Sequence, residues 1–361
     1  MKKEVAHTKM KSKQKTKEVA KMRKTIMAVL LALLSIALVS VSANAAITGH
    51  CSDCHTMHNS QDGAPVDGAG PNDNLTKFSC VGCHSGAVAA APNVFGQLAA
   101  ARTAGGTFNS NIVDAAATDY HKVHNVRDIS WSNDEVELLN ITPGAEGGGF
   151  TEPVGAAELT CAGALGCHGQ ASGGFKGFHH NGYPNAYRFL RFNDGAGGYT
   201  DIQGKGSPDR ELGGATAANH NVYYALLNDS VATRDSISSL CSLCHGVFHG
   251  ATDTSSTSPG TSPWKRHPTD VAIPTAWDSI GSGVTIDYNV TPFGFNGADY
   301  TAMTPSTAYS ATLSDNPRVI CVSCHRAHGS DNNDLLRFDY AGQSAGGGGT
   351  TGCLACHTAV R

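Results

Sequence analysis

Apolar side chains gather in one continuous run near the start of the chain and are scattered elsewhere. The run extends from Ile26 to Val41, follows a lysine-rich segment and precedes the small-x-small sequence Ala43-Asn44-Ala45. This order of features is typical of a secretory signal peptide. An uncleaved membrane anchor is the alternative, but a run of about 16 apolar residues is shorter than the ~20 that span a bilayer. We predict a signal peptide over residues 1–45 and a mature domain over residues 46–361.

The mature domain shows few windows with the 3.6-residue apolar period of an amphipathic helix. Its linkers, such as Ala251–Pro263 and Gly342–Gly352, are rich in Gly, Ser, Thr, Asn and Pro, which is typical of loops. With 42 glycines, such a chain buries too few side chains to offset the entropy of ordering it. We predict a mostly irregular chain with little sheet and short helical turns after each cysteine–histidine motif, with its apolar interior supplied by something other than side chains.

The cysteines supply the candidate chemistry. All twelve fall into six pairs, and a histidine follows each pair directly. Five pairs read C-x-x-C-H: Cys51, Cys54 and His55; Cys80, Cys83 and His84; Cys241, Cys244 and His245; Cys321, Cys324 and His325; Cys353, Cys356 and His357. The sixth reads C-x5-C-H and consists of Cys161, Cys167 and His168.

C-x-x-C-H is the attachment motif of c-type haem. The spacing lets one turn of backbone place both thiols along one porphyrin edge, where they join the two vinyl groups. The histidine that follows then projects at the iron, and its Nδ1–H normally goes to a carbonyl. Zinc ribbons also use C-x-x-C pairs, but they do not require a histidine after each second cysteine. The pattern predicts six covalently bound haem c groups.

The C-x5-C-H segment needs its three extra residues to bulge out. Gly163 and Gly166 permit such a bulge because glycine accepts backbone angles that other residues avoid. A haem with a single thioether, or a disulfide between Cys161 and Cys167, is the alternative. Because His168 follows in register, we predict full attachment.

Histidines also suffice for the second axial position of each iron. Beyond the signal peptide only Met57 and Met303 are available as methionine ligands, which cannot serve six haems. Ten histidines of the mature domain lie outside the motifs, and we treat His50 and His121 as spare and expect the pair His179-His180 to ligate through one member. The predicted second ligands are His58, His124, His180, His220, His249, His267 and His328.

The charge of the mature domain limits its partners. The signal peptide takes 10 of the 26 basic and two of the 30 acidic residues, which leaves 16 basic against 28 acidic residues, a net charge of −12. This balance argues against nucleic acid, which needs a basic surface. Redox proteins, or extracellular acceptors such as metal oxides, are the expected partners.

Several segments together resemble the hexahaem outer-surface cytochromes of metal-reducing bacteria, some of which form filaments. They are Cys51–Ser60, the KRHP sequence at 265–268, Cys321–Ser330 with Leu336-Arg337-Phe338 after it, and the terminal CLACH. The resemblance implies a multihaem cytochrome c fold, with short helices and loops wrapped around a stacked haem array. It also implies that His58 ligates a haem of a neighbouring copy, giving a homopolymer. The segment from Cys161 to His180 departs from the filament pattern.

We therefore predict an exported electron carrier of the periplasm, outer surface or extracellular space, with six bis-histidine haems and no catalytic residues. The alternative is a multihaem oxidoreductase with one open haem site. Such an enzyme needs an open iron position, and some such enzymes replace a motif histidine by lysine. No motif here does so.

Overall fold

The chain divides into a unit over Met1–Ile47 and a compact unit over Thr48–Arg361. The computed structural model describes residues 21–23, 50–66, 71, 75–77, 80–86, 91–95, 105–108, 122–124, 126, 129, 159–162, 166–168, 179, 186–193, 199–206, 221–226, 234–245, 267, 269–273, 285–287, 291–302, 310–312, 317–344 and 351–357. Of the predicted signal peptide, only 21–23 fall in this set, and they are helical. Within the described residues, no helix combines the length and apolar character needed to cross a membrane.

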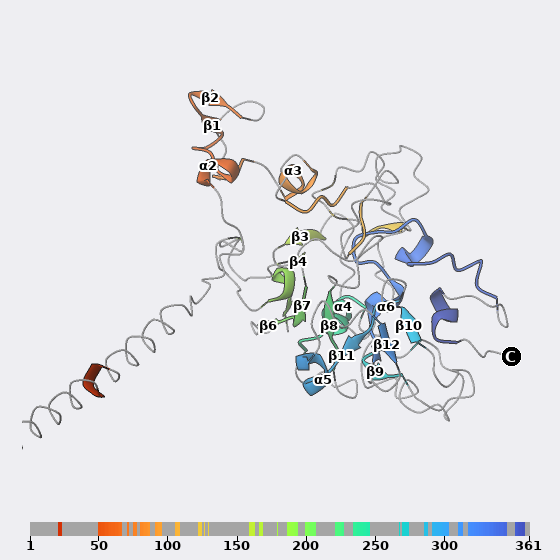
Figure 1. Ribbon diagram of the computed structural model, residues 1–361. Coiled ribbons are helices and arrows are strands. Elements are labelled where there is room, and N and C mark those ends of the chain that lie inside the picture. Colours follow the sequence, from red (N-terminus) through yellow and green to blue (C-terminus); the bar gives the residue numbers. More distant parts are fainter. Residues whose placement is uncertain are drawn as a thin grey trace, which may run out of the picture. The chain divides into compact units, whose positions relative to one another are not determined.

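Helices in the described residues are short, and most of them coincide with cysteine motifs (Figure 1). The α-helices are α2 (Cys51–Cys54), α3 (Cys80–His84), α4 (Ile237–Ser242), α5 (Gly297–Ala302) and α6 (Cys321–Cys324), and the 3-10 turns are η5 (Tyr187–Phe189), η9 (Asn333–Leu335) and η10 (Gly352–Ala355). The predicted short helices and largely irregular chain are confirmed here. The turns lie on the C-x-x-C segments themselves rather than after the histidines.

The described residues contain more β-sheet than predicted, although every strand has only two or three residues. Four two-stranded sheets pair β1 (Ser60–Gln61) with β2 (Ala64–Pro65), β3 (Thr160–Ala162) with β4 (Gly166–His168), β5 (Arg191–Asn193) with β6 (Tyr199–Asp201), and β10 (Thr285–Asp287) with β12 (Ser310–Thr312). A five-stranded sheet has the order β7 (Gly204–Lys205), β8 (Val222–Tyr224), β11 (Gly294–Phe295), β13 (Arg318–Val319) and β9 (Val271–Ala272). Within this sheet only β8 and β11 run parallel, and the other neighbours are antiparallel.

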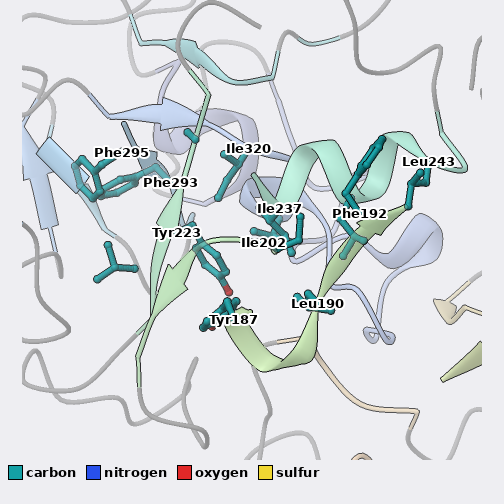
Figure 2. Close-up of a cluster of buried hydrophobic side chains, with 14 of the residues drawn as sticks. Tyr187, Leu190, Phe192, Ile202, Tyr223, Ile237, Leu243, Phe293, Phe295 and Ile320 are labelled. Atoms are coloured by element: carbon teal, nitrogen blue, oxygen red, sulfur yellow. The ribbon is translucent and has the colours of Figure 1, made fainter. Parts of the chain in front are cut away.

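Side chains build an apolar core around the five-stranded sheet, which we call the main core (Figure 2). Its most deeply buried large side chains are Ile202, Val222, Phe293, Phe295 and Ile320, each at most 1% exposed. The rings of Phe293 and Phe295 meet edge to face with centres 5.4 Å apart. The expectation that side chains supply no apolar interior is therefore wrong for this part of the chain. The core residues come from several short strands, from α4 and from the links between these elements, so no sequence window contains more than a few of them.

Polar contacts fix α4 against α6 at the edge of the main core. The Ser236 side chain caps α4 by accepting a hydrogen bond from Ser239 N at 3.0 Å and donates to the buried Asp270 carboxylate at 2.9 Å. Cys321 N at the start of α6 donates to Ser238 Oγ at 3.2 Å. Side-chain capping of this kind stabilises a helix start by about 1 kcal/mol. The motifs at Cys241 and Cys321 are thereby held together.

A second apolar cluster, here called the small core, joins two further motifs. Its buried members are Phe108, Val123, Val126 and Ile129. Val81 of the second motif and Cys161 of the C-x5-C-H segment both pack against it.

Candidate functional site

The C-x-x-C segments share one local geometry. The motif histidine donates its backbone N–H to the carbonyl of the first cysteine in four motifs: His55 to Cys51 at 2.8 Å, His245 to Cys241 at 3.0 Å, His325 to Cys321 at 3.1 Å and His357 to Cys353 at 2.9 Å. This single helical turn places the two cysteines three residues apart on one face. All twelve cysteines lie in the described residues, and no disulfide links them. The arrangement presents two thiols to one edge of a ligand.

The motif histidines are oriented by backbone carbonyls. The ring Nδ1 lies in hydrogen-bond range of a carbonyl oxygen for His55 (Leu75, 3.2 Å), His84 (Pro92, 2.9 Å), His168 (Arg188, 2.9 Å) and His325 (Asp334, 2.7 Å). A carbonyl only accepts, so Nδ1 carries the proton and Nε2 keeps its lone pair. Two predicted second ligands follow the same rule, with His124 donating to Ala327 O and His328 to Gly106 O. Each of these rings is prepared to bind a metal through Nε2.

Four motif histidines each face a second histidine at nearly the same spacing. The ring centres are 6.3 Å apart for His84 and His179, 6.1 Å for His124 and His245, 6.0 Å for His168 and His328, and 6.2 Å for His267 and His357. An imidazole nitrogen binds a transition metal at about 2 Å and lies about 1.1 Å from its ring centre, so two imidazoles flanking one metal have centres about 6 Å apart. The four pairs fit one metal ion each. In the described residues, no group of three or more His, Cys, Asp or Glu side chains gathers at one point.

Burial keeps several of these imidazoles neutral. Desolvation lowers the pKa of His328 to about 3 and that of His124 to about 4, with smaller contributions from neighbouring histidines, while a backbone hydrogen bond opposes the shift. Desolvation is also the main cause of the lowered pKa values of His168 and His357. All four side chains nevertheless keep part of their accessible surface. These histidines are therefore not fully covered by protein atoms, which a ligand of an iron requires.

The remaining predicted second ligands are placed differently. His58 lies exposed just before β1, in the left-handed region with φ 54°. His180, His220 and His249 lie outside the described residues. His179, which the prediction set aside in favour of His180, is the member of that pair that faces His84. The sequence signal was the adjacent pair itself, which did not distinguish its members.

Contacts connect the motifs in chain order. Lys77 N, shortly before the second motif, donates to Cys54 O at 2.9 Å, and the small core joins Val81 to Cys161. His124 N donates to His328 O at 3.0 Å, which joins the two histidine pairs of the third and fourth motifs. The fourth and fifth motifs meet through α4 and α6. Burial, with smaller contributions from the nearby Cys353 and Cys356, raises the pKa of the Cys324 thiol to about 12, so the sixth motif lies near the fifth.

The C-x5-C-H segment forms a strand pair instead of a helical turn. β3 and β4 run parallel, with Thr160 opposite Gly166 and Ala162 opposite His168. Desolvation by the surrounding protein, with a smaller contribution from Cys244 of the next motif, raises the pKa of the Cys167 thiol to about 12, although the side chain keeps exposed surface. This third site along the chain therefore has its histidine pair in place but a different backbone under its cysteines.

Paired thiols, carbonyl-oriented imidazoles and facing histidines are the features of c-type haem sites, and the residues present fit that group. Residues 318–361, with the last two motifs, match the family model of the doubled CXXCH motif. The chain is 27% identical over 360 residues to the C-type cytochrome OmcS of Geobacter sulfurreducens, covering 83% of this chain and 82% of that protein. The predicted resemblance to outer-surface multihaem cytochromes is confirmed.

Two solved structures are also similar. The cryo-EM structure of the OmcS nanowires from Geobacter sulfurreducens has a TM-score of 0.49 at 20% identity and covers 81% of this chain and 84% of that one. The outer membrane cytochrome S filament from the same organism has a TM-score of 0.43 at 22% identity, with 82% and 84% covered.

Proposed function

We propose that the mature chain attaches six haem c groups through its six motifs and relays electrons among them outside the cytoplasm. The observation that carries this proposal is the set of four histidine pairs at 6.0–6.3 Å, each containing one motif histidine. A bound haem supplies an iron that gains or loses one electron. Export to the periplasm, outer surface or extracellular space follows from the predicted signal peptide. Redox proteins or extracellular acceptors such as metal oxides are the proposed partners.

The chain's own residues determine how each haem is held. In this proposal the axial pairs are His84 with His179, His245 with His124, His168 with His328, and His357 with His267. His55 and His325 hold the two remaining haems from one side. Carbonyl acceptors fix the ring orientation, and burial holds the buried imidazoles neutral, so that Nε2 is available at any ordinary pH.

The contacts between consecutive motifs support one path along the chain. Hydrogen bonds, apolar contacts and helix contacts link each motif to the next from Cys51 to Cys353. Electrons entering at the first haem would therefore leave near the C-terminal motif, or the reverse. No step in this path needs a proton donor or a substrate pocket.

Saturated irons distinguish transfer from catalysis, and EPR of the ferric protein tests the proposal. In the EPR spectrum we expect low-spin signals from irons with two histidine ligands, and one additional high-spin iron in His124→Ala. The mass of the intact protein should include six haems. His50→Ala is the matched control, because His50 belongs to no pair, and it should match the wild type. A high-spin, ligand-binding iron in a wild-type preparation with every copy assembled would favour the oxidoreductase alternative instead.

A filament is a second element of the proposal, carried by His58 and His325. His58 is exposed next to the exposed Met57, which is 72% accessible. Among the described histidines, none faces His325 at the spacing of the four pairs. We propose that His58 of one copy ligates the haem held by His325 of the next copy.

Negative-stain microscopy of the secreted protein tests this arrangement. We expect filaments in the wild type and in His50→Ala, and dispersed particles with one high-spin iron in His58→Ala. Uniform wild-type monomers with every iron low-spin would refute the filament while leaving electron transfer intact.

A further inference from the structure

The third motif lacks the helical turn on which the other sites rest, yet its cysteines are placed side by side. Thr160 is opposite Gly166 and Ala162 is opposite His168 in the parallel pair β3–β4. Cys161 and Cys167 therefore occupy matching positions between these two pairs. In a parallel pair, matching positions point to the same face of the sheet. The six-residue step thus presents two thiols on one face, as the C-x-x-C turn does elsewhere.

The distance between the strands distinguishes a disulfide between these thiols from two separate thioethers. Neighbouring strands lie about 4.8 Å apart, and the Cβ atoms of matching residues are separated by a similar distance with parallel Cα–Cβ bonds. A disulfide requires Cβ atoms at about 3.8 Å that approach each other. Two separate acceptors side by side, such as the vinyl groups on one porphyrin edge, suit the parallel arrangement better.

The surroundings of both strands complete a site. Cys161 packs against the small core with Leu159. His168 donates from Nδ1 to Arg188 O at 2.9 Å, and its ring faces His328 at 6.0 Å between centres. The thiols and a complete histidine pair therefore belong to one place in the fold.

We infer that the C-x5-C-H segment is a full haem-attachment site in which a parallel strand pair replaces the helical turn, and that Cys161 and Cys167 both form thioethers. In each addition, the sulfur forms a bond to one vinyl carbon, the thiol hydrogen ends on the neighbouring carbon, and the vinyl double bond becomes single. No electrons are gained or lost, so no oxidant is needed. This inference rests on the proposed haem binding.

Gly166 is the residue that permits this backbone. A Cβ at this position would lie 2.5 Å from both Cα and the carbonyl carbon of Ala162, which are backbone atoms that cannot turn aside. Any other residue at position 166 would push the strands apart and separate the two thiols. Thr160 Oγ1 donates to Ala162 O at 2.7 Å and supports the same stretch of backbone.

Peptide mass mapping of the purified holoprotein, after alkylation of unfolded protein with and without reductant, tests the inference. We expect the third-motif peptide to carry one haem and no alkyl group under either condition. One alkyl group with haem present, or two alkyl groups that appear only after reduction, would overturn it in favour of a single thioether or a disulfide. If the other five motifs carry haem and this one does not, the inference fails alone; if none carries haem, the proposed function fails.

Two variants sharpen the result. Gly166→Ala should lose the Cys161 thioether or the whole third haem. Gly342→Ala should keep all six, because Gly342 lies in an exposed turn where the nearest atom to a new Cβ is the movable Asp339 carboxylate at 3.1 Å and the nearest backbone atom is at 3.7 Å. Because Gly166→Ala could fail to fold, Cys161→Ala provides an independent measurement. It should keep six haems and show a pyridine haemochrome spectrum with one unreacted vinyl group. A Cys161→Ala spectrum identical to the wild type would overturn the inference.

Discussion

Truncation of Ile320 tests whether side chains, and not porphyrins alone, hold the fourth and fifth motifs together. Ile320 is 1% exposed, directly precedes α6 and belongs to the main core (Figure 2). Its Cγ2 lies so close to Gly294 that a Cβ there would be 3.1 Å away, so the contact is tight. Ile320→Ala would remove three buried carbons from this packed place.

The expected loss follows from two contributions. Three methyl or methylene groups at about 0.8 kcal/mol each give about 2.4 kcal/mol of lost transfer free energy. A cavity of roughly 75 Å³, at ~24 cal/mol per Å³, adds up to about 1.8 kcal/mol if the surroundings do not collapse. We therefore expect the free energy of unfolding to fall by about 3–4 kcal/mol.

Guanidinium denaturation of the holoprotein, followed by the loss of the low-spin Soret band, measures this change. Tyr340→Ala is the control, because Tyr340 is 71% exposed and should change stability by less than about 0.5 kcal/mol. If Ile320→Ala costs under about 1 kcal/mol, the porphyrins carry the interior and the main core is not what holds these motifs.

Three further substitutions address the ligands and helix starts. Gly105→Ala would place a Cβ 3.0 Å from Nδ1 of His328 and displace the ring, so EPR should show one high-spin iron; six low-spin irons would contradict the packing. Asn59→Ala removes the 3% exposed side chain that accepts from Val66 N at 3.2 Å, so the turn presenting His58 should loosen and filaments should shorten in negative stain, whereas wild-type lengths would show that the turn holds itself. Ser236→Ala removes the cap of α4 and the hydrogen bond to the buried Asp270 carboxylate, so it should cost about 2–3 kcal/mol in guanidinium denaturation, and an unchanged midpoint would mean that both contacts are dispensable.

The sequence could predict most fully the features that depend on short spacing. The C-x-x-C-H turns are local, so their helices and histidine positions follow from five adjacent residues. The second ligands depend on the whole fold: His328 meets His168, and His124 meets His245, across long stretches of chain. His179 and His180 are adjacent and chemically equal, and only the fold distinguishes them.

The interior was missed for a similar reason. Phe293 and Phe295 lie in and just before a strand of two residues, too short to show an alternating pattern. Val222 joins them from β8 and Ile202 from the link between β6 and β7, and no single window contains more than a few of these residues. A core assembled from short segments far apart in the sequence shows no sustained periodicity.

The carbonyl acceptors of the motif histidines have a consequence for how far such a chain can diverge. Leu75, Pro92, Arg188 and Asp334 share no side-chain chemistry, yet each provides the same oxygen to an imidazole. Every residue type carries that oxygen, so substitution at these positions leaves the hydrogen bond intact as long as the backbone keeps its course. Linkers can therefore change in sequence. Insertions are limited only by the need to keep a backbone carbonyl within hydrogen-bond distance of each imidazole Nδ1. A family built in this way can lose most of its sequence identity without losing its ligand geometry.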